Sequence, residues 1–234
     1  MIHCISVENM RQSDAYTIAN FVPSLALMHR AAFGVFKAVD WQKGSTAIVV
    51  GSGNNGGDGF ALACILKEQG FTCTIFTISQ HFSADSVYYA DKAKDSGITI
   101  RPYEDGCLSG YGIVVDCLLG TGFSGAVRSN YRAVIDAINA SGAYVVSVDI
   151  NSGMNGDTGE AELAVHSDLT VTIGYVKTGL IRECAGKYMK RLVCADIGIV
   201  LLKEEYQICQ ADEHIPLGCL PCPEWLDTDM ISAI

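Results

Sequence analysis

The chain has 234 residues, of which 49% are hydrophobic and 18% are charged. This composition excludes a disordered or low-complexity chain and predicts one sizeable core, in a single α/β domain or at most two small ones. The formal net charge of -10 argues against a broad basic face, and therefore against nucleic acid or an anionic membrane as a partner.

Targeting signals and cysteine usage point to the same compartment. No uncharged apolar run reaches the ~18 residues that a membrane helix needs, and the segment 1–20 carries Glu8, Arg11 and Asp14, where a signal peptide would be apolar. The sequence therefore predicts a cytoplasmic protein. Its ten cysteines mostly stand singly in apolar segments, so we expect reduced, buried thiols. For the one close pair, Cys219 and Cys222, a structural role is favoured over a zinc or redox role.

Hydrophobic periodicity divides the chain into alternating strands and helices after a polar, helical N-terminal segment. In chain order we expect a helix over 24–39, a strand over 46–50, a helix over 60–69, strands over 73–78, 98–102 and 112–116 with a helix over 88–94, a helix over 131–138, and strands over 144–149, 169–175 and 190–199. Strands separated by single helices predict one doubly wound, mostly parallel sheet with helices on both faces. Because the pattern weakens beyond about residue 202, we place the domain at 1–202 and a C-terminal tail at 203–234.

Three unusual loops follow strands of this predicted sheet. They read GSGNNGGDG at 51–59, DCLLGTGFSG at 116–125 and DINSG at 149–153. Parallel sheets of this type bind ligands beyond the carboxyl ends of their strands, where loops gather and helix N-termini present backbone N–H groups. We therefore expect all three loops to lie along one rim.

The first loop matches the GxGxxG pattern of dinucleotide-binding dehydrogenases, but the next strand ends without the acid that would hold the ribose. A P-loop is excluded because Gly57 and Asp58 replace its Lys and Ser or Thr, and no GxSxG motif suggests a hydrolase. Alone, the loop could be a tight turn in which Asp58 stabilises a helix start. A second loop over 120–125 could also cradle a phosphate, and two such loops on one rim favour a dinucleotide ligand.

Asp116 and Asp149 each end an apolar strand, where either could simply accept hydrogen bonds from the following turn. Together with Asn55 and Ser152 they form an all-oxygen cluster suited to a hard cation. Asp149 could instead be a general acid or base, and the residues alone leave both roles open. The five scattered histidines read as structural. Lys177 and Arg128 are candidate phosphate contacts, although solvated side chains are the commoner case.

The order NNGGDG, D-x-x-x-GTG, VDI-x-SG and TVTIGYVKTGL resembles the YjeF N-terminal family, the NAD(P)H-hydrate epimerases, from about residue 6 to residue 199. The resemblance implies a Rossmann-like three-layer α/β/α sandwich. It further implies an isomerase that interconverts the R and S forms of hydrated NADH and NADPH, NADHX and NADPHX, so that an S-specific dehydratase can restore the cofactor. A homodimer is implied too, as is functional coupling to that dehydratase, on a separate chain or on the same full-length chain.

Residue by residue, the resemblance implies a potassium ion held by Asn55, Asp116 and Ser152, and Asp149 as a substrate-binding acid that acts as acid/base near carbon six of the nicotinamide ring. The substrate would be bound by two loops and this acid: Asn54, Asn55, Gly56, Gly57, Asp58, Gly120, Thr121, Gly122, Phe123, Ser124, Gly125, Ala126 and Asp149.

The chain departs from the family pattern in two motifs. Asn151 replaces the Pro of the usual DIPSG, which removes a rigid φ but keeps the acid and the hydroxyl, so we expect the site to survive. The LMENAG-like helix reads LMHRAA at 27–32, so a role for its Glu is not transferred. The segment 225–230 resembles the linker to a dehydratase domain. The rival interpretation is a non-catalytic dimerising scaffold of the same fold, with a dehydrogenase third. Nothing in the sequence separates NADHX from NADPHX.

Overall fold

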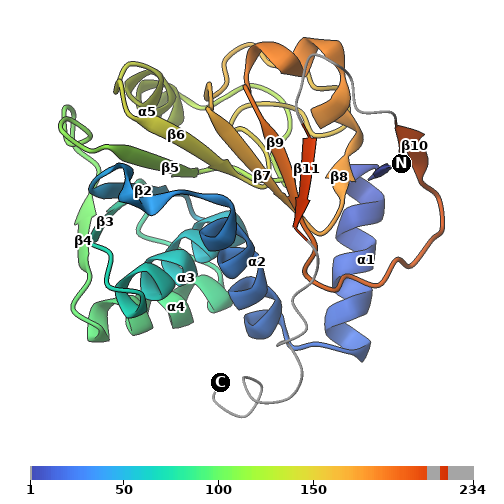
Figure 1. Ribbon diagram of the computed structural model, residues 1–234, viewed down its shortest axis with the longest axis horizontal. Coiled ribbons are helices and arrows are strands. Elements are labelled where there is room, and N and C mark those ends of the chain that lie inside the picture. Colours follow the sequence, from blue (N-terminus) through green and yellow to red (C-terminus); the bar gives the residue numbers. More distant parts are fainter. Residues whose placement is uncertain (1, 210–216, 221–234) are drawn as a thin grey trace.

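The computed structural model describes residues 2–209 and 217–220 and has an eight-stranded central sheet (Figure 1). The strand order is β11-β9-β7-β6-β5-β2-β3-β4, and every neighbouring pair is parallel. The expected parallel, doubly wound sheet is confirmed. Its strands are β2 (Thr46–Val50), β3 (Cys73–Thr77), β4 (Thr99–Pro102), β5 (Ile113–Cys117), β6 (Tyr144–Val148), β7 (Leu169–Ile173), β9 (Leu192–Ala195) and β11 (Leu217–Leu220).

Helices cover both faces of this sheet, which makes the three layers expected (Figure 1). α2 (Ser24–Ala38), α3 (Asn54–Glu68) and α4 (Ala84–Asp95) pack on one face, and α5 (Ser129–Asn139) packs on the other. Successive residues of a strand point to opposite faces, so β2 sends Ile48 and Val50 into the first core, and Ala47 and Val49 into the second. Burial on both faces explains why the strands are apolar without alternation.

A second, three-stranded sheet lies beside the first, in the order β10-β1-β8. It contains β1 (Ile2–Ile5), β8 (Val176–Lys177) and β10 (Gln207–Cys209). The described residues also form three short 3-10 helices: η1 (Trp41–Lys43), η2 (Thr178–Ile181) and η3 (Glu183–Lys187).

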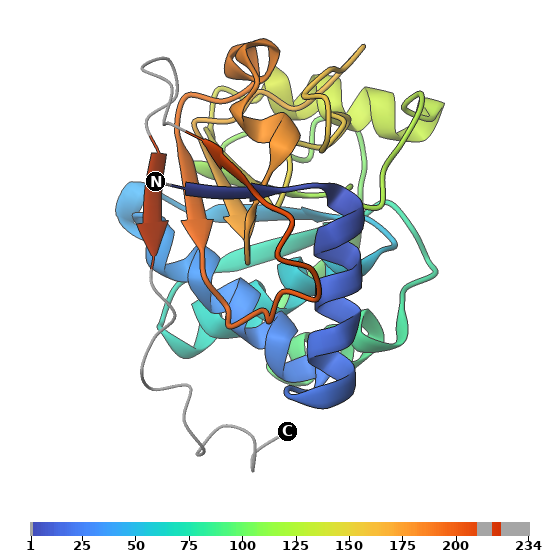
Figure 2. The same ribbon diagram turned by 90° about the vertical axis from the view of Figure 1, so that its right-hand side faces the viewer.

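α1 (Val7–Asn20) lies beside the segment 200–205 (Figure 2), and side chains of the helix bond to that segment. Three buried polar residues of α1 spaced by four, Asn9, Ser13 and Thr17, bond to the backbone of that segment, and we call this set the polar ladder. Its contacts are Thr17 Oγ1 from Val200 N–H (2.9 Å), Ser13 Oγ from Leu202 N–H (3.0 Å), and Asn9 Nδ2 to the carbonyls of Lys203 (3.2 Å) and Glu205 (3.0 Å). Side chains on one face of α1 thus form the hydrogen bonds with this backbone that a neighbouring strand would otherwise form.

The largest departure from the predicted elements is the start of α3, which begins at Asn54 rather than at residue 60. Asn and Gly are weak helix formers, so tertiary packing decides here. A Cβ on Gly56 would lie 2.3 Å from the Gly51 carbonyl oxygen, and one on Gly57 would lie 2.6 Å from Met28. The glycines let the first turns of α3 approach β2 and α2, and the predicted loop is therefore mostly helix.

The C-terminal part differs as well. Strand β9 is four residues long, where a strand over 190–199 was expected, and the unexpected strands β10 and β11 lie beyond residue 202. The domain boundary at 202 stays a prediction, and Cys222 and the segment 225–230 lie outside the described residues. Cys219 is exposed on β11, whereas burial raises the pKa of Cys194 to about 12. Within the described residues, no helix combines the length and apolarity needed to cross a membrane.

Candidate active site

The three loops meet at one edge of the sheet, as predicted. β6, β5 and β2 are neighbours, so their carboxyl ends and the loops that follow lie side by side. These loops surround a cavity of about 750 Å³, which α1 and α2 close from the other side. The predicted substrate contacts that line it are Asn54, Asn55, Asp58, Gly120, Thr121, Gly122, Phe123, Ser124, Ala126 and Asp149.

Three predicted contacts are not among the residues that line this cavity. Gly56 and Gly57 face the strand end and α2, where they permit close packing. Gly125 adopts a φ of +83°, a conformation that favours glycine, so it shapes the loop after β5. Arg128 and Lys177, the candidate phosphate contacts, do line the cavity.

Asp149 lies at the centre of a strained turn directly after β6. Its φ of +69° is the only positive value at a non-glycine residue in the described part of the chain. The Ile150 N–H donates to the Val148 carbonyl (2.9 Å), which closes a γ-turn with Asp149 at its centre. The N–H of Asp149 donates to the Val171 carbonyl (2.8 Å). Residues held in such conformations cluster at functional sites because the surrounding structure must enforce them.

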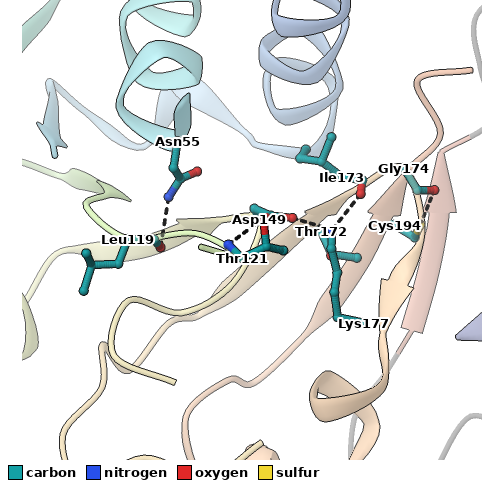
Figure 3. A network of polar contacts seen from close by, with 9 residues as sticks. All are labelled: Asn55, Leu119, Thr121, Asp149, Thr172, Ile173, Gly174, Lys177 and Cys194. Carbon is teal, nitrogen blue, oxygen red and sulfur yellow. Dashed lines mark hydrogen bonds and ion pairs between the residues drawn. The ribbon is translucent and has the colours of Figure 1, made fainter. Parts of the chain in front are cut away.

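The Asp149 carboxylate is held from two sides (Figure 3). The Lys177 ammonium donates to Oδ1 at 2.5 Å, and the Thr121 N–H donates to Oδ2 at 3.3 Å. Asp149 is 13% exposed and Lys177 is 1% exposed, so this ion pair is buried in the cavity wall. The longer contact leaves Oδ2 as the less engaged oxygen.

Asp116, at the end of β5, is fully buried beneath the cavity. Its Oδ1 accepts from Ser152 Oγ (2.5 Å) and the Leu118 N–H (3.2 Å). Its Oδ2 accepts from Ser147 Oγ (2.9 Å) and the Ser152 N–H (3.0 Å). Burial raises the pKa of Asp116, whereas these hydrogen bonds act to lower it. Asp116 and Ser152 thus lie together, as the sequence suggested.

Asn55 supplies an unpartnered oxygen near this network. Its Nδ2 donates to the Leu119 carbonyl (3.1 Å), which fixes the amide's orientation, and its buried Oδ1 has no partner (Figure 3). The same Leu119 carbonyl lies 3.2 Å from Ser152 Oγ, so Asn55 and Ser152 converge on one loop. A buried oxygen without a donor is unfavourable unless a cation or a ligand meets it. In the described residues there is no cluster of three or more His, Cys, Asp or Glu that could hold a metal ion. The groups gathered around the unpartnered Asn55 Oδ1 are oxygen donors, and such donors fit a hard cation.

Two further acids, Asp14 on α1 and Asp58 on α3, line the cavity. Burial raises the pKa of Asp58 well above its ordinary value, and the nearby charges of Asp149 and Asp14 raise it further. Burial likewise raises the pKa of Asp14. The cavity therefore holds carboxyl groups in unlike environments, with Asp149 the one bonded to Lys177.

Asn151 anchors the loop in which Pro was expected from the family pattern. Its side chain is fully buried and bonds to four partners in the chain that follows. The two N–H groups of Nδ2 are shared among the Val165 carbonyl (2.9 Å), Ser167 Oγ (3.0 Å) and the Tyr188 carbonyl (2.9 Å), and Oδ1 accepts from Thr170 Oγ1 (2.6 Å). Asn151 thus fixes the loop by side-chain bonds instead of by a rigid ring.

The sequence did not reveal two parts of the site. One is the N-terminal wall, where Val7, Met10 and Ile18 of α1 line the cavity. The other is the pairing of Lys177 with Asp149. A signal for it existed: Lys177 stands alone in an apolar run, where a charged group needs a partner.

The fold and this cavity define a Rossmann-like α/β protein with a cavity at the carboxyl edge of its sheet. Residues 24–179 match the family described as "YjeF-related protein N-terminus". The chain belongs to this family, which confirms the resemblance inferred from its loops.

Relatives of this chain carry names that refer to NAD(P)H-hydrate. The protein named NAD(P)H-hydrate epimerase of Lentilactobacillus buchneri is 33% identical over 85% of this chain and 96% of its own length. Its namesake in Limosilactobacillus fermentum is 37% identical over 82% of this chain and 95% of its own length. The bifunctional NAD(P)H-hydrate repair enzyme Nnr of Coxiella burnetii is 34% identical over 81% of this chain and 40% of its own length.

A solved structure supports the fold. The yeast protein YNL200c superposes with a TM-score of 0.69 at 20% sequence identity, over 80% of this chain and 86% of the yeast chain. This likeness concerns the architecture.

Proposed function

We propose that the chain is an NAD(P)H-hydrate epimerase, which interconverts the R and S forms of hydrated NADH or NADPH in cofactor repair. The observation that carries this proposal is Asp149, a strained carboxylate presented between two glycine-rich loops in a cavity of about 750 Å³. That volume lies within the range of small-molecule sites. The names of the relatives supply the substrate.

Asp149 is the residue to which we assign proton transfer. In the hydrated cofactor, carbon six of the nicotinamide ring bears a hydroxyl and is bonded to the ring nitrogen. Inversion at that carbon needs either loss and return of the hydroxyl or opening and reclosure of the C6–N1 bond. Both routes need a group that gives and takes a proton beside carbon six. Asp149 Oδ2 suits this role because only the 3.3 Å contact from the Thr121 N–H engages it.

The two glycine-rich loops suit the phosphates of the substrate. The N-terminus of α3 presents backbone N–H groups at 53–55, and the loop at 120–126 lies across the cavity from α1. In the described part of the chain Arg128 makes no ion pair, so its guanidinium is available to a phosphate. These groups supply the local positive potential that an anionic substrate needs in a protein of net charge -10.

Asn55, Asp116 and Ser152 would hold a potassium ion. The unpartnered Asn55 Oδ1 and the buried charge of Asp116 support this assignment. Bound potassium would offset the Asp116 charge and fasten the loop that begins at Leu119. The cytoplasmic location, the homodimer and the coupling to a dehydratase stay predictions; the bifunctional name of the Coxiella burnetii relative supports the coupling.

The test mixes the protein with R-enriched NADHX and an S-specific dehydratase, and follows the recovery of NADH absorbance with and without potassium. Conversion of the R form beyond a control without protein is expected, and it should be stronger with potassium. The variant Asn55→Ala should lose the response to potassium. A folded sample that binds the hydrate but does not convert the R form would instead favour a non-catalytic binding module.

A further inference from the structure

Lys177 is a cation buried in the wall of the cavity. It ends the two-residue strand β8 and is 1% exposed. Transfer of an ammonium group from water to the interior is unfavourable unless charge and hydrogen bonds compensate it. An apolar side chain of the same length would fill this space without that cost, so the reason for the lysine must lie in what its ammonium contacts.

All three N–H donors of the ammonium are used by the chain itself (Figure 3). Nζ donates to Asp149 Oδ1 (2.5 Å), the Ile173 carbonyl (2.7 Å) and Thr172 Oγ1 (3.2 Å). The ammonium is therefore fixed at the junction of β7 and β8. With no donor left over, Lys177 is not placed to bind a phosphate, which was the role considered from sequence.

The Lys177–Asp149 pair differs from the other ion pairs in the part of the chain that the structure describes. Each of the other three has a partner that is at least 65% exposed, whereas these two side chains are 1% and 13% exposed. Exposed pairs contribute little because water screens them, and a buried pair is held in one geometry. This is the ion pair that can orient a reacting group.

Asp149 needs such an anchor because its backbone is strained and because other acidic side chains lie near its carboxylate. Its φ of +69° is strained for a residue with a side chain. Asp14 and Asp58 face the same cavity from α1 and α3, and any negative charge on them repels the Asp149 carboxylate. The Cys194 thiol on β9, which lies near Lys177 and Asp149, carries no charge because burial raises its pKa to about 12.

We propose that Lys177 is a positioning residue for the epimerase reaction: it binds Asp149 Oδ1, compensates its charge and leaves Oδ2 turned toward the substrate. The Thr121 N–H completes the clamp from the opposite loop. Lys177 acts through Asp149 and does not touch the substrate. This inference rests on the proposed function, because the reaction defines what Asp149 does.

The test compares Lys177→Met with wild type and with Lys190→Met in the R-enriched NADHX assay at constant potassium. Lys190 is the matched control, since it pairs with Asp168 at 2.7 Å but has an 80% exposed side chain. For K177M we expect kcat to fall about 100-fold and KM to change less than about threefold, as for a group that acts on the reacting state rather than on binding. K190M should match wild type. If wild type itself is inactive, the proposed function fails; if wild type is active and K177M equals it, the positioning role alone fails.

Two further readouts separate positioning from a structural role. Ethylammonium, which can enter the space that Lys177→Ala leaves and donate hydrogen bonds there, should raise the activity of K177A at least about tenfold, whereas tetramethylammonium should not. The double variant K177M/D149N should melt at a higher temperature than K177M, because it removes the unpaired buried carboxylate, yet remain inactive. A raised KM with unchanged kcat, or recovery of activity in the double variant, would overturn the proposal.

Discussion

Asp116 and Asp149 end neighbouring strands of one sheet, yet they lie in opposite kinds of surroundings. Asp116 is fully buried and receives four hydrogen bonds from neutral donors. Asp149 faces the cavity in a strained turn, with one ammonium and one amide N–H as its partners. The first carboxylate ties the loops together, and the second is presented to a ligand. A carboxylate at a strand end is therefore assigned by its partners and exposure, and its position in the sequence does not suffice.

Asp149→Asn should have the largest effect on activity. Asn tolerates a positive φ, so the turn should be kept, while the group that exchanges a proton is lost. We expect epimerisation to fall about a thousandfold, within the range for removal of a general acid or base. The coupled NADH assay measures this, and circular dichroism checks the fold. Activity within a factor of ten of wild type would remove Asp149 from the proton-transfer role.

Asp116→Ala should lower the stability of the protein, beside any effect on potassium binding. It leaves the Ser147 hydroxyl, the Leu118 N–H and the Ser152 N–H without their buried acceptor. We expect a loss of about 3 kcal/mol in the free energy of unfolding, since each orphaned donor is unfavourable. Urea unfolding measures it, with Glu162→Ala as a control from an exposed ion pair, expected to change stability by less than about 0.5 kcal/mol. Equal effects of the two variants would contradict the assignment.

Asn151→Ala tests whether side-chain bonds replace the rigid Pro of the family pattern. The variant removes four buried hydrogen bonds at once. We expect a loss of about 2 kcal/mol and a smaller loss of activity, because Asp149 and Ser152 lie on either side of Asn151. Asn20→Ala, which removes a hydrogen bond on the exposed end of α1, should be nearly neutral in the same urea titration. A stability equal to wild type would mean that the loop is fixed by other contacts.

Asp58→Asn should change how the stability of the protein depends on pH. The pKa of Asp58 is higher in the folded protein than in the unfolded chain, where it is about 3.9. The folded protein therefore favours the protonated carboxyl, and this contribution to stability is complete below about pH 3.9. It is lost as the pH rises from there toward the pKa in the folded protein. The variant lacks this loss, so its melting temperature should equal that of wild type near pH 4 and exceed it by about 3 °C near pH 7.5. A melting difference that stays constant across this pH range would show that Asp58 ionises normally.

The sequence predicted the parallel sheet and the meeting of the three loops at its edge, because both follow from short sequence patterns. Apolar strand runs and the glycine loops after them place Asp116 and Asp149 at one edge without knowledge of any contact. The start of α3 was missed because the packing of Gly56 and Gly57 overrides the weak helix propensity of the segment. The Lys177 clamp was missed because its two partners are 28 residues apart, on segments whose meeting depends on the whole sheet.

The polar ladder has a consequence for how the protein is made. Thr17 bonds to Val200 and Asn9 bonds to Glu205, over separations of 183 and 196 residues. During synthesis the N-terminal helix therefore emerges long before the segment that fastens it. The central strands can pair meanwhile, but the α1 wall of the cavity cannot be fixed until the ribosome has delivered residues 200–205. Competence to enclose a ligand is thus acquired only after residues 200–205 have been made and have bonded to α1.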